Sequence, residues 1–395
     1  MNFAGRNGFL FIELLVTSLI CVATGCISEK SPRPRSDAPP KDALLALQNL
    51  KAKYAPENRF GLYAVGLKPV GTQLVLTGLV DNVAAIAETE RAMRALGVPV
   101  TNAIRLLPDP GLAERTWGIA TLSVASAREL PDHKAELGMQ VLMGRLVRIL
   151  ERGTNAMWYH IQSADGYCAW LERGTFVHCS QPEVDAWTNS PLLFVTTTEE
   201  MIWSKPDRAS EPVSDVVLAD LIRKTGEQGE WYQVELPDKR AGFLPKTAAE
   251  DYQAWKPKRQ PLPENIERTA RMFLGRPYLW GGDSPKGFDC SGFTHMVFFL
   301  NGIELSRNSS QQARQGLDVP LDANLSRLAR GDLLFFGAPP RGDRPERIHH
   351  VGIYLGDKLF IHSSERVQIN SLDPESPIRD EHRIRTLLRA RRVLQ

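Results

Sequence analysis

The sequence Gly287-Phe288-Asp289-Cys290-Ser291-Gly292-Phe293 contains the residue on which the interpretation of the whole chain depends, Cys290. It follows the turn-rich segment 276–282 and precedes 293–300, an apolar run without Gly or Pro that is long enough for about two helical turns. Cys290 is therefore expected where a loop becomes a helix. Unpaired N–H groups and the positive end of the helix dipole favour a thiolate at such a place. A lone cysteine in an apolar helix is more often a buried structural residue, so the position alone does not establish a nucleophile.

Two histidines later in the chain supply further catalytic groups. The runs 348–356 and 359–364 are apolar and β-branched, and a Gly-Asp pair separates them, which is typical of a β-hairpin. Such a hairpin brings His350 and His362 to the same end of neighbouring strands. They share a face only if the loop holds an odd number of residues, and the segment 356–358 is the obvious candidate. A cysteine at a helix start and two histidines on one hairpin face provide a nucleophile, a base and a residue that orients the base.

Several short motifs in the last third of the chain resemble those of the NlpC/p60-type cysteine peptidases, a papain-like family that cuts bacterial cell-wall peptides. They occur in the order found in that family, which is far more specific than any single motif. The matching motifs are Tyr278-Leu279-Trp280-Gly281-Gly282, Phe288-Asp289-Cys290-Ser291-Gly292, Ser306-Arg307-Asn308-Ser309, Gly331-Asp332-Leu333-Leu334-Phe335-Phe336, His350-Val351-Gly352-Ile353-Tyr354 and Phe360-Ile361-His362.

The expected chemistry is attack of the Cys290 thiolate on an amide carbonyl. His350 takes the thiol proton and then returns a proton to the leaving amine, while His362 holds the His350 ring in the productive tautomer. Backbone N–H groups at the helix start form an oxyanion hole. The resemblance adds the hydroxyl of Tyr278 to that hole; its alternative role is that of an aromatic wedge in the loop.

Two other histidines are not expected to take part. His349 precedes the proposed base in the same strand and should point to the opposite face. His295, five residues after the nucleophile, falls off the catalytic face of the helix and is expected to contribute packing.

The resemblance also implies a substrate. Family members with two SH3-like domains ahead of the peptidase domain cut between γ-D-glutamate and diaminopimelate, and they prefer a free N-terminal L-alanine. The ammonium group of that alanine needs acidic or acceptor partners, because a buried unpaired charge is costly. Asp289 and Ser291 match the substrate-binding pair of the family. Glu136 and Tyr167 match residues that close the pocket; the alternatives are a solvated acid and a core tyrosine.

The sequence departs from the family pattern at one position. Asn308 follows Arg307, a further substrate-binding candidate, where such members often carry Asp. The requirement for a free amine is therefore open, although the peptidase interpretation is not affected. The polar residues around the nucleophile also disfavour an acyltransferase or thioesterase on the same scaffold, which would need an apolar groove.

Composition limits the remaining possibilities. The chain has 395 residues, too many for one ordinary core, and a net charge of +2 with 24% charged residues, which does not suggest a nucleic-acid binder. The five cysteines match no Cys-x-x-Cys metal spacing, and no metal or organic cofactor is expected. Cys168 and Cys179 lie in one predicted hairpin. They could pair in an oxidising compartment or be two small buried side chains.

The N-terminal segment indicates export. Residues 9–25 are apolar, have the length of a signal-peptide core and end in Ala23-Thr24-Gly25-Cys26, which resembles a lipoprotein cleavage site with Cys26 as the lipidated residue. Residues 8–13 also resemble a prepilin-type leader, but that interpretation needs a longer uninterrupted apolar helix. Both interpretations predict an exported, tethered protein. The proline-rich segment 31–41 cannot form a core, and we interpret it as a tether that holds the protein away from the membrane.

The predicted fold class is α+β, with a papain-like catalytic domain behind smaller modules. Short strands separated by turns from residue 117 onward predict a small SH3-like β-barrel, and Trp231-Tyr232 repeats the pattern of Trp158-Tyr159 in a second, more divergent copy. The expected divisions are 1–26 signal peptide and lipobox, 27–41 flexible tether, 42–108 a small α/β module with a faint BON-like pattern, 109–185 and 190–255 SH3-like domains, and 258–395 the peptidase domain.

The sequence therefore predicts a membrane-anchored lipoprotein of the periplasm or cell envelope, acting as a monomer. Its expected activity is that of a cysteine endopeptidase on the γ-D-glutamyl-diaminopimelate bond of peptidoglycan stem peptides or murein fragments. The alternatives are a non-catalytic wall-binding lipoprotein that uses its SH3-like domains, and the papain-like acyltransferase. The first is disfavoured because Cys290, His350 and His362 are all retained.

Overall fold

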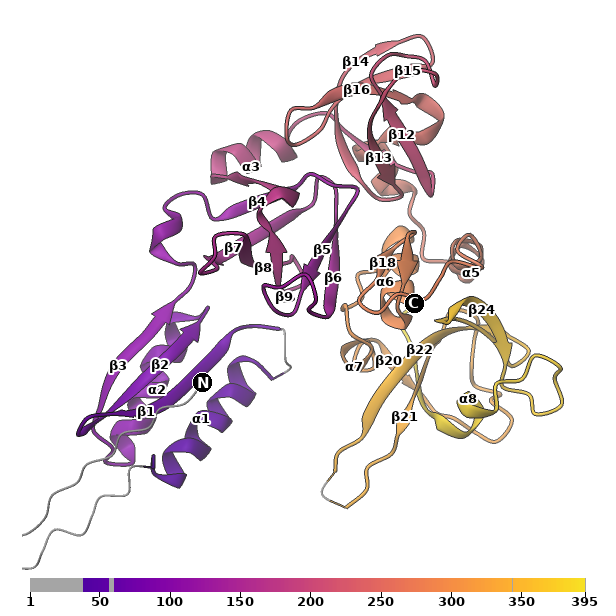
Figure 1. The fold of residues 1–395 in the computed structure, drawn as a ribbon. Helices are drawn as coiled ribbons and strands as arrows, with labels where there is room; N and C mark the ends of the chain where they lie inside the picture. The colour runs from indigo at the N-terminus through magenta and orange to yellow at the C-terminus, as the bar shows by residue number, and fades with distance from the viewer. Residues whose placement is uncertain (1–37, 57–59, 343, 395) are drawn as a thin grey trace, which may run out of the picture. The chain divides into compact units, whose positions relative to one another are not determined.

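The computed structural model describes residues 38–56, 60–342 and 344–394 (Figure 1). The predicted leader with Cys26, and nearly all of the predicted tether, lie outside these residues. Among the residues that are described, no helix combines the length and the apolar character needed to cross a bilayer.

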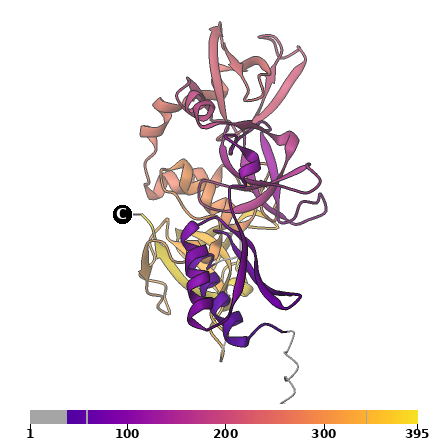
Figure 2. The ribbon, with the colours of Figure 1, turned by 90° about the vertical axis from the view of Figure 1, so that its left-hand side faces the viewer.

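The first module pairs two helices with a three-stranded sheet. Strand β1 is antiparallel to β2, and β2 is parallel to β3. Figure 2 shows both helices on one face of this sheet. Helix α2 begins after Asn82, whose side-chain oxygen accepts a hydrogen bond from the backbone N–H of Ala84 at 2.9 Å. The elements are α1 Lys41–Tyr54, β1 Tyr63–Val70, β2 Gln73–Val80, α2 Val83–Ala95 and β3 Val100–Leu106; α1 was not predicted from the sequence.

The second module is a seven-stranded sheet with the strand order β10-β4-β7-β8-β9-β5-β6. Its elements are η1 Pro110–Leu112, β4 Trp117–Ala120, β5 Val124–Arg128, β6 Leu137–Leu142, β7 Leu146–Arg152, β8 Trp158–Gln162, β9 Cys168–Glu172, η2 Arg173–Thr175, β10 Phe176–Cys179 and α3 Gln181–Thr188. Helix α3 begins with a capping box between Ser180 and Glu183.

The third module repeats this topology. Its order, read from the other end, is β17-β11-β14-β15-β16-β12-β13, so each strand has its counterpart at the same place in the second module. This agreement supports the predicted internal repeat, which the sequences alone indicate only faintly. The elements are β11 Leu192–Val195, β12 Glu199–Trp203, β13 Pro212–Val217, β14 Leu221–Gln228, β15 Trp231–Glu235, β16 Ala241–Pro245, η3 Lys246–Ala248 and β17 Ala249–Asp251.

Cys168 and Cys179 are free and buried. They lie on β9 and β10, which three strands separate in the sheet. The expectation that they belong to one hairpin is therefore wrong, because η2 carries the chain away from β9 before β10 begins. Of the two alternatives left open by the sequence, the structure supports two small buried side chains.

The catalytic module packs helix α6 against one face and helix α8 against the other face of a six-stranded antiparallel sheet, ordered β20-β25-β21-β22-β23-β24. Helix α6 contacts β22 and β23, the strands that carry the two histidines. The elements, with the preceding linker, are α4 Tyr252–Trp255, η4 Lys256–Lys258, α5 Pro263–Arg271, β18 Asp283–Ser284, β19 Gly287–Phe288, α6 Cys290–Leu300, α7 Ser309–Gln312, β20 Leu317–Val319, β21 Leu333–Ala338, β22 Arg347–Gly356, β23 Leu359–Ser364, β24 Arg366–Ser371, α8 Glu381–Thr386 and β25 Leu387–Arg392.

Aromatic side chains fix α6 in place. Phe288, Phe293 and Phe273 are fully buried, and their rings meet edge to face with centroids 4.8 to 6.4 Å apart. Such aromatic pairs contribute about 0.5–1.5 kcal/mol each beyond the area that they bury. The start of α6 is thereby held rigidly against the sheet.

Candidate active site

Cys290 is the first residue of α6, as the sequence predicts. Asp289 is the N-cap, and its Oδ1 accepts a hydrogen bond from the backbone N–H of Gly292 at 2.7 Å. A side chain at Gly292 would not fit, because a Cβ there would lie 2.1 Å from the carbonyl oxygen of Gly282. The motif around the nucleophile is therefore also the motif that starts the helix tightly against the preceding loop.

The histidine hairpin forms, but its turn differs from the one expected. Asp357 and Lys358 make a two-residue turn with φ of 50° and 60°, and the register shifts between Tyr354 and Gly356. Leu355 is the extra residue of this bulge. It reverses the direction in which the following side chains of β22 point, which is the effect that a third loop residue would have had. The predicted three-residue loop is therefore wrong. The predicted consequence, that both histidines share a face, is confirmed by the contact between their rings described next.

A row of hydrogen bonds crosses three neighbouring strands on this face. His350 Nε2 lies 2.7 Å from His362 Nδ1, and His362 Nε2 lies 2.9 Å from Asn370 Oδ1. The amide of Asn370 is itself oriented, because its Nδ2 donates a hydrogen bond to the carbonyl of Ile378 at 3.1 Å. Gly352 leaves the space that the rings need, since a Cβ there would lie 3.2 Å from the Cβ of His362.

This row determines the tautomers of both neutral rings. The Asn370 oxygen can only accept, so His362 carries its proton on Nε2 and accepts at Nδ1. His350 must then donate from Nε2, which leaves its Nδ1 as an unprotonated base. The sequence did not identify Asn370. Its only signal is its alternation with Gln368 on β24, which becomes informative once the pairing of β24 with β23 is known.

The electrostatics of Cys290 differ from the expectation of a preformed thiolate. Burial, and next the charge of Asp289, raise the pKa of the Cys290 thiol to about 12. Backbone N–H groups of Val351 and Ser291 oppose this shift but do not outweigh it. The start of the helix therefore lowers the pKa of Cys290 by less than burial raises it, and the resting side chain is a thiol.

Both histidines are neutral at pH 7. Burial, and next the neighbouring His362, lower the pKa of His350 well below its usual value. Burial lowers the pKa of His362 to about 4, although the Asn370 hydrogen bond opposes the shift. Cys290 and both histidines are thus neutral, so attack by the Cys290 sulfur would require transfer of the thiol proton.

Tyr278 is half-buried in the loop before the nucleophile, and its backbone N–H donates to the carbonyl of Glu365 at 2.8 Å. Burial, and next the charges of Cys290 and Asp289, raise the pKa of its phenol. The hydroxyl therefore stays protonated and close enough to Cys290 to interact with its charge. This environment suits a hydrogen-bond donor to a developing oxyanion.

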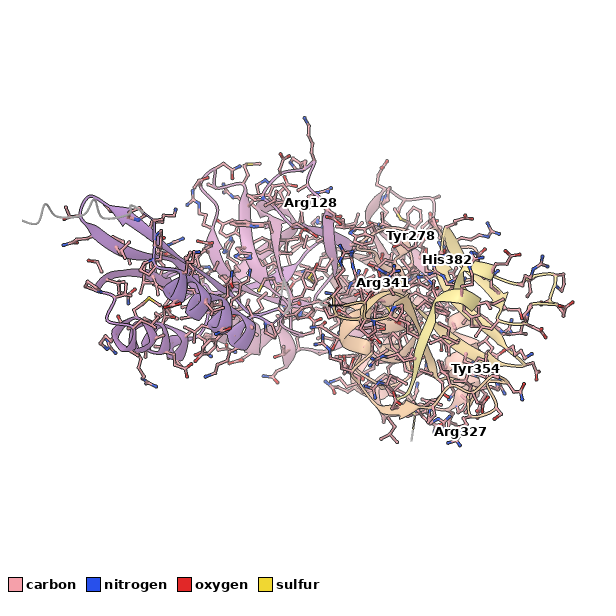
Figure 3. The ribbon with its side chains drawn as sticks, turned by 90° about the horizontal axis from the view of Figure 1, so that it is seen from below. Arg128, Tyr278, Arg327, Arg341, Tyr354 and His382 are labelled. Atoms are coloured by element: carbon pink, nitrogen blue, oxygen red, sulfur yellow. The ribbon has the colours of Figure 1, made fainter. Side chains whose placement is uncertain are left out.

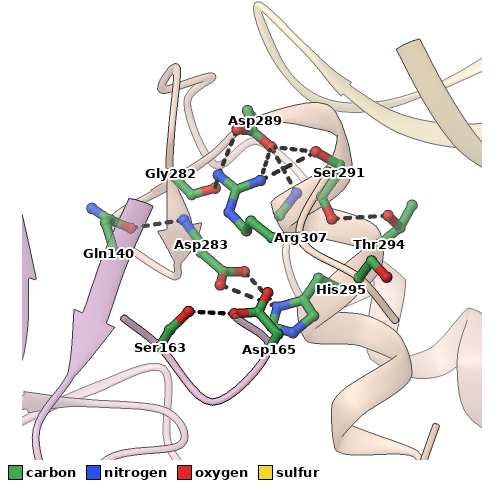
Figure 4. Close-up of polar contacts among 12 residues, drawn as sticks. Gln140, Ser163, Asp165, Gly282, Asp283, Asp289, Ser291, Thr294, His295 and Arg307 are labelled. Carbon is green, nitrogen blue, oxygen red and sulfur yellow. Dashed lines mark hydrogen bonds and ion pairs between the residues drawn. The ribbon is translucent and has the colours of Figure 1, made fainter. Parts of the chain in front are cut away.

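Asp289, the residue before Cys290, forms a buried ion pair with Arg307 (Figure 4). Arg307 Nη2 donates to Asp289 Oδ2 at 2.6 Å, and Nη1 donates to Oδ1 at 3.0 Å and to the hydroxyl of Ser291 at 3.1 Å. The backbone N–H of Gly281 also donates to Asp289. Burial lowers the pKa of Arg307, but Asp289 and then Asp283 outweigh it and raise that pKa. The three predicted binding residues are thus brought together, with their charges largely satisfied by one another.

The second module reaches the loop before the nucleophile. The side chain of Gln140 on β6 accepts a hydrogen bond from the backbone N–H of Asp283 at 2.8 Å. A Cβ at Gly281 would lie 2.3 Å from the carbonyl oxygen of Leu137, so these backbones touch. Glu136, the preceding residue, is exposed at this contact. Tyr167 is completely buried, with its ring edge-on to Phe60 at 5.1 Å.

His349 and His295, the two histidines that were not expected to take part in catalysis, lie outside the row of hydrogen bonds. His349 is exposed and lies where the register between β21 and β22 shifts, so the alternation of the strand does not determine which face it is on. His295 Nδ1 lies 3.0 Å from Asp283 Oδ1 (Figure 4). Burial lowers the pKa of His295, but the Asp283 carboxylate outweighs it and raises that pKa. His295 therefore anchors the loop before the nucleophile rather than merely filling space.

A cysteine at the start of a central helix that packs on the strands carrying two hydrogen-bonded histidines is typical of a papain-like cysteine hydrolase. Two family models match the chain: "NlpC/P60 family" over residues 275–386 and "Bacterial dipeptidyl-peptidase Sh3 domain" over residues 128–174. The chain belongs to the NlpC/P60 family of cysteine peptidases, whose members hydrolyse peptidoglycan.

Individual relatives extend over several modules. A gamma-D-glutamyl-L-lysine dipeptidyl-peptidase of Bacillus cereus is 30% identical over 280 residues, covering 69% of this chain and 78% of that protein. Dipeptidyl-peptidase 6 of Lysinibacillus sphaericus is 29% identical over 268 residues, covering 63% of this chain and 89% of that protein. A solved structure of an NlpC/P60 family protein from Bacillus cereus has a TM-score of 0.59 and 25% identity, covering 71% of this chain and all of that one.

Proposed function

We propose that this protein hydrolyses the amide bond between γ-D-glutamate and the diamino acid of peptidoglycan stem peptides. The observation that carries the proposal is the row from Asn370 through His362 to His350, which leaves His350 Nδ1 unprotonated on β22, one of the two strands that α6, with Cys290 at its start, contacts. The relatives named as γ-D-glutamyl-L-lysine dipeptidyl-peptidases support this choice of bond. The diamino acid is diaminopimelate by the sequence prediction and lysine in those names.

In the proposed reaction the Cys290 sulfur attacks the γ-carbonyl carbon while its proton passes to His350 Nδ1. The tetrahedral oxyanion accepts hydrogen bonds from backbone N–H groups at the start of α6 and from the hydroxyl of Tyr278. His350 then gives the proton to the leaving amine, and the C–N bond breaks to form a thioester. Water, deprotonated by His350, attacks the thioester and regenerates the thiol.

The amino end of the substrate would lie near Glu136, at the contact between β6 and the loop before the nucleophile. Glu136 is exposed and forms no side-chain hydrogen bond or ion pair with the described residues, whereas Asp289 is neutralised by Arg307. Glu136 is therefore the acid best able to receive the L-alanine ammonium. Asn308 is half-buried and also leaves its side-chain amide without a hydrogen bond among the described residues.

The test is incubation of the full-length protein with L-Ala-γ-D-Glu-diaminopimelate, its lysine counterpart and N-acetylated forms of both, followed by mass spectrometry. Release of L-Ala-D-Glu by the wild type but not by Cys290→Ala would support the proposed bond and nucleophile. Cleavage of the free-amine peptides alone would support binding of the L-alanine ammonium by Glu136. Cleavage of the acetylated forms as well would show that this ammonium is not required and would refute that role. If no peptide is cut, the proposed bond is wrong.

A further inference from the structure

The guanidinium of Arg383, on helix α8, is buried with a single long ion pair and an unsatisfied donor. Its side chain is only 14% exposed, and its Nε is completely buried and makes no hydrogen bond within the described residues. Its nearest acid is Asp380, with 3.9 Å between Nε and the carboxylate oxygen. Most buried polar groups in proteins are hydrogen-bonded, and a buried donor left unpaired is destabilising. Within the described residues, a completely buried Nε without a hydrogen bond, on a guanidinium whose ion-pair partner is 3.9 Å away, indicates a missing acceptor.

Arg383 lies at the catalytic centre. Its guanidinium carbon is 5.5 Å from the ring centre of Phe336, and that ring is 5.8 Å from the ring of His350. Its charge interacts with those of Cys290 and Tyr278. Figure 3 labels Tyr278 and the adjacent His382 on this part of the catalytic module.

The charge of Arg383 opposes the chemistry of the free enzyme. It lowers the pKa of His350 and His362, and so disfavours the imidazolium that forms when Cys290 loses its proton. The catalytic pair alone therefore gives no reason for a cation at this place. An anion bound to Arg383 would satisfy the unpaired donor and would also remove the penalty on the base.

We propose that Arg383 binds a carboxylate of the substrate next to the bond that is cut. This inference rests on the proposed function, whose substrate carries a free α-carboxylate on the D-glutamate and another on the diamino acid. A guanidinium binds a carboxylate through two parallel hydrogen bonds, which suits Arg383 better than a lysine would. Both carboxylates offer the same chemistry, and substrate analogues distinguish them.

The experiment combines Arg383 variants with amidated substrates. L-Ala-γ-D-Glu-L-Lys is compared with one analogue carrying an α-amide on the glutamate and another carrying a C-terminal amide on the lysine. Wild type, Arg383→Met and Arg383→Lys are assayed for kcat/KM. Arg385→Met removes the same charge from an exposed position of the same helix and is the matched control.

The wild type should lose roughly 10- to 100-fold in kcat/KM on the analogue whose contacted carboxylate is amidated, the range for a hydrogen bond to a charged group. Arg383→Met should lose a similar factor on the parent peptide and should no longer discriminate against that analogue. Arg383→Lys should recover part of the discrimination, and Arg385→Met should behave as wild type. A variant damaged only in folding would lose activity equally on all three peptides.

If Arg383→Met and the wild type discriminate equally between the parent peptide and the amidated analogues, the inference is wrong and the proposed function is unaffected. Failure of the wild type to cut any peptide would overturn the function instead. In that case calorimetric binding of the parent peptide to the Cys290→Ala protein, with and without Arg383→Met, still tests the carboxylate site. Weaker binding with the second change supports it, and equal binding refutes it.

Discussion

Replacement of Asn370 tests the tautomer row directly. In Asn370→Ala, His362 Nε2 loses the acceptor at 2.9 Å, and its proton can move to Nδ1. That tautomer places an N–H against His350 Nε2, 2.7 Å away, and forces His350 to carry its own proton on Nδ1, the atom that must accept from the thiol. The residue would act by positioning the base, without touching the substrate.

The magnitude follows from the hydrogen bond that is lost. A neutral hydrogen bond contributes about 0.5–1.5 kcal/mol net, so the productive tautomer should fall in population, and kcat with it, by roughly 2- to 12-fold. Asn370→Asp keeps the acceptor and adds a negative charge, which favours the imidazolium form. The acid limb of the kcat/KM profile, which lies below pH 6.5 because burial lowers the pKa of His350, should therefore move upward.

The assay is the pH dependence of kcat/KM on L-Ala-γ-D-Glu-L-Lys for wild type, Asn370→Ala and Asn370→Asp. Gln368→Ala is the matched control, because its amide lies on the same strand but donates to the carbonyl of Ser364. Wild-type rates and an unshifted acid limb in both Asn370 variants would show that the row does not control the base.

Four further outcomes follow from the geometry. His350→Ala should reduce kcat by about 10²–10⁴-fold, whereas His349→Ala, which changes an exposed side chain outside the row, should leave it near wild type in the same peptide assay. Arg307→Met should destabilise the protein by about 3–5 kcal/mol in urea unfolding, because it leaves a buried carboxylate unpaired. Gly352→Ala should cost about 1–3 kcal/mol in the same measurement, since its Cβ would lie 3.1 Å from a neighbouring ring, and a neutral result would contradict the close packing. With the pKa of Cys290 raised to about 12, alkylation by iodoacetamide should keep accelerating above pH 9, and a plateau near pH 7 would indicate a preformed thiolate.

Local patterns in the sequence were sufficient for the main features of the site. The start of α6 at Cys290 follows from a turn-rich segment before an apolar run, and the shared face of His350 and His362 follows from the alternation of strands. The bulge at Leu355 could not be predicted, because either a bulge or an odd loop gives the same facing. Only the partner strand distinguishes them.

The features that were missed depend on contacts between distant segments. Asn370 becomes meaningful only through the register of β24, and Arg307 looked like a substrate ligand until its partners on Asp289 were known. Helix α1 has a weakly amphipathic sequence without a capping side chain, so its residues gave little local signal. Burial, which decides the pKa of Cys290, is likewise a property of the whole fold.

The charges around the nucleophile oppose the ion pair that the reaction needs. Asp289 raises the pKa of Cys290 and so disfavours the thiolate, while Arg383 lowers the pKa of His350 and so disfavours the imidazolium. In the free enzyme both effects keep thiol and imidazole neutral. If a substrate carboxylate pairs with Arg383, one of the two effects disappears as the substrate binds. Proton transfer from Cys290 would then be favoured only in the complex, which gives the site a way to discriminate against peptides that lack the anion.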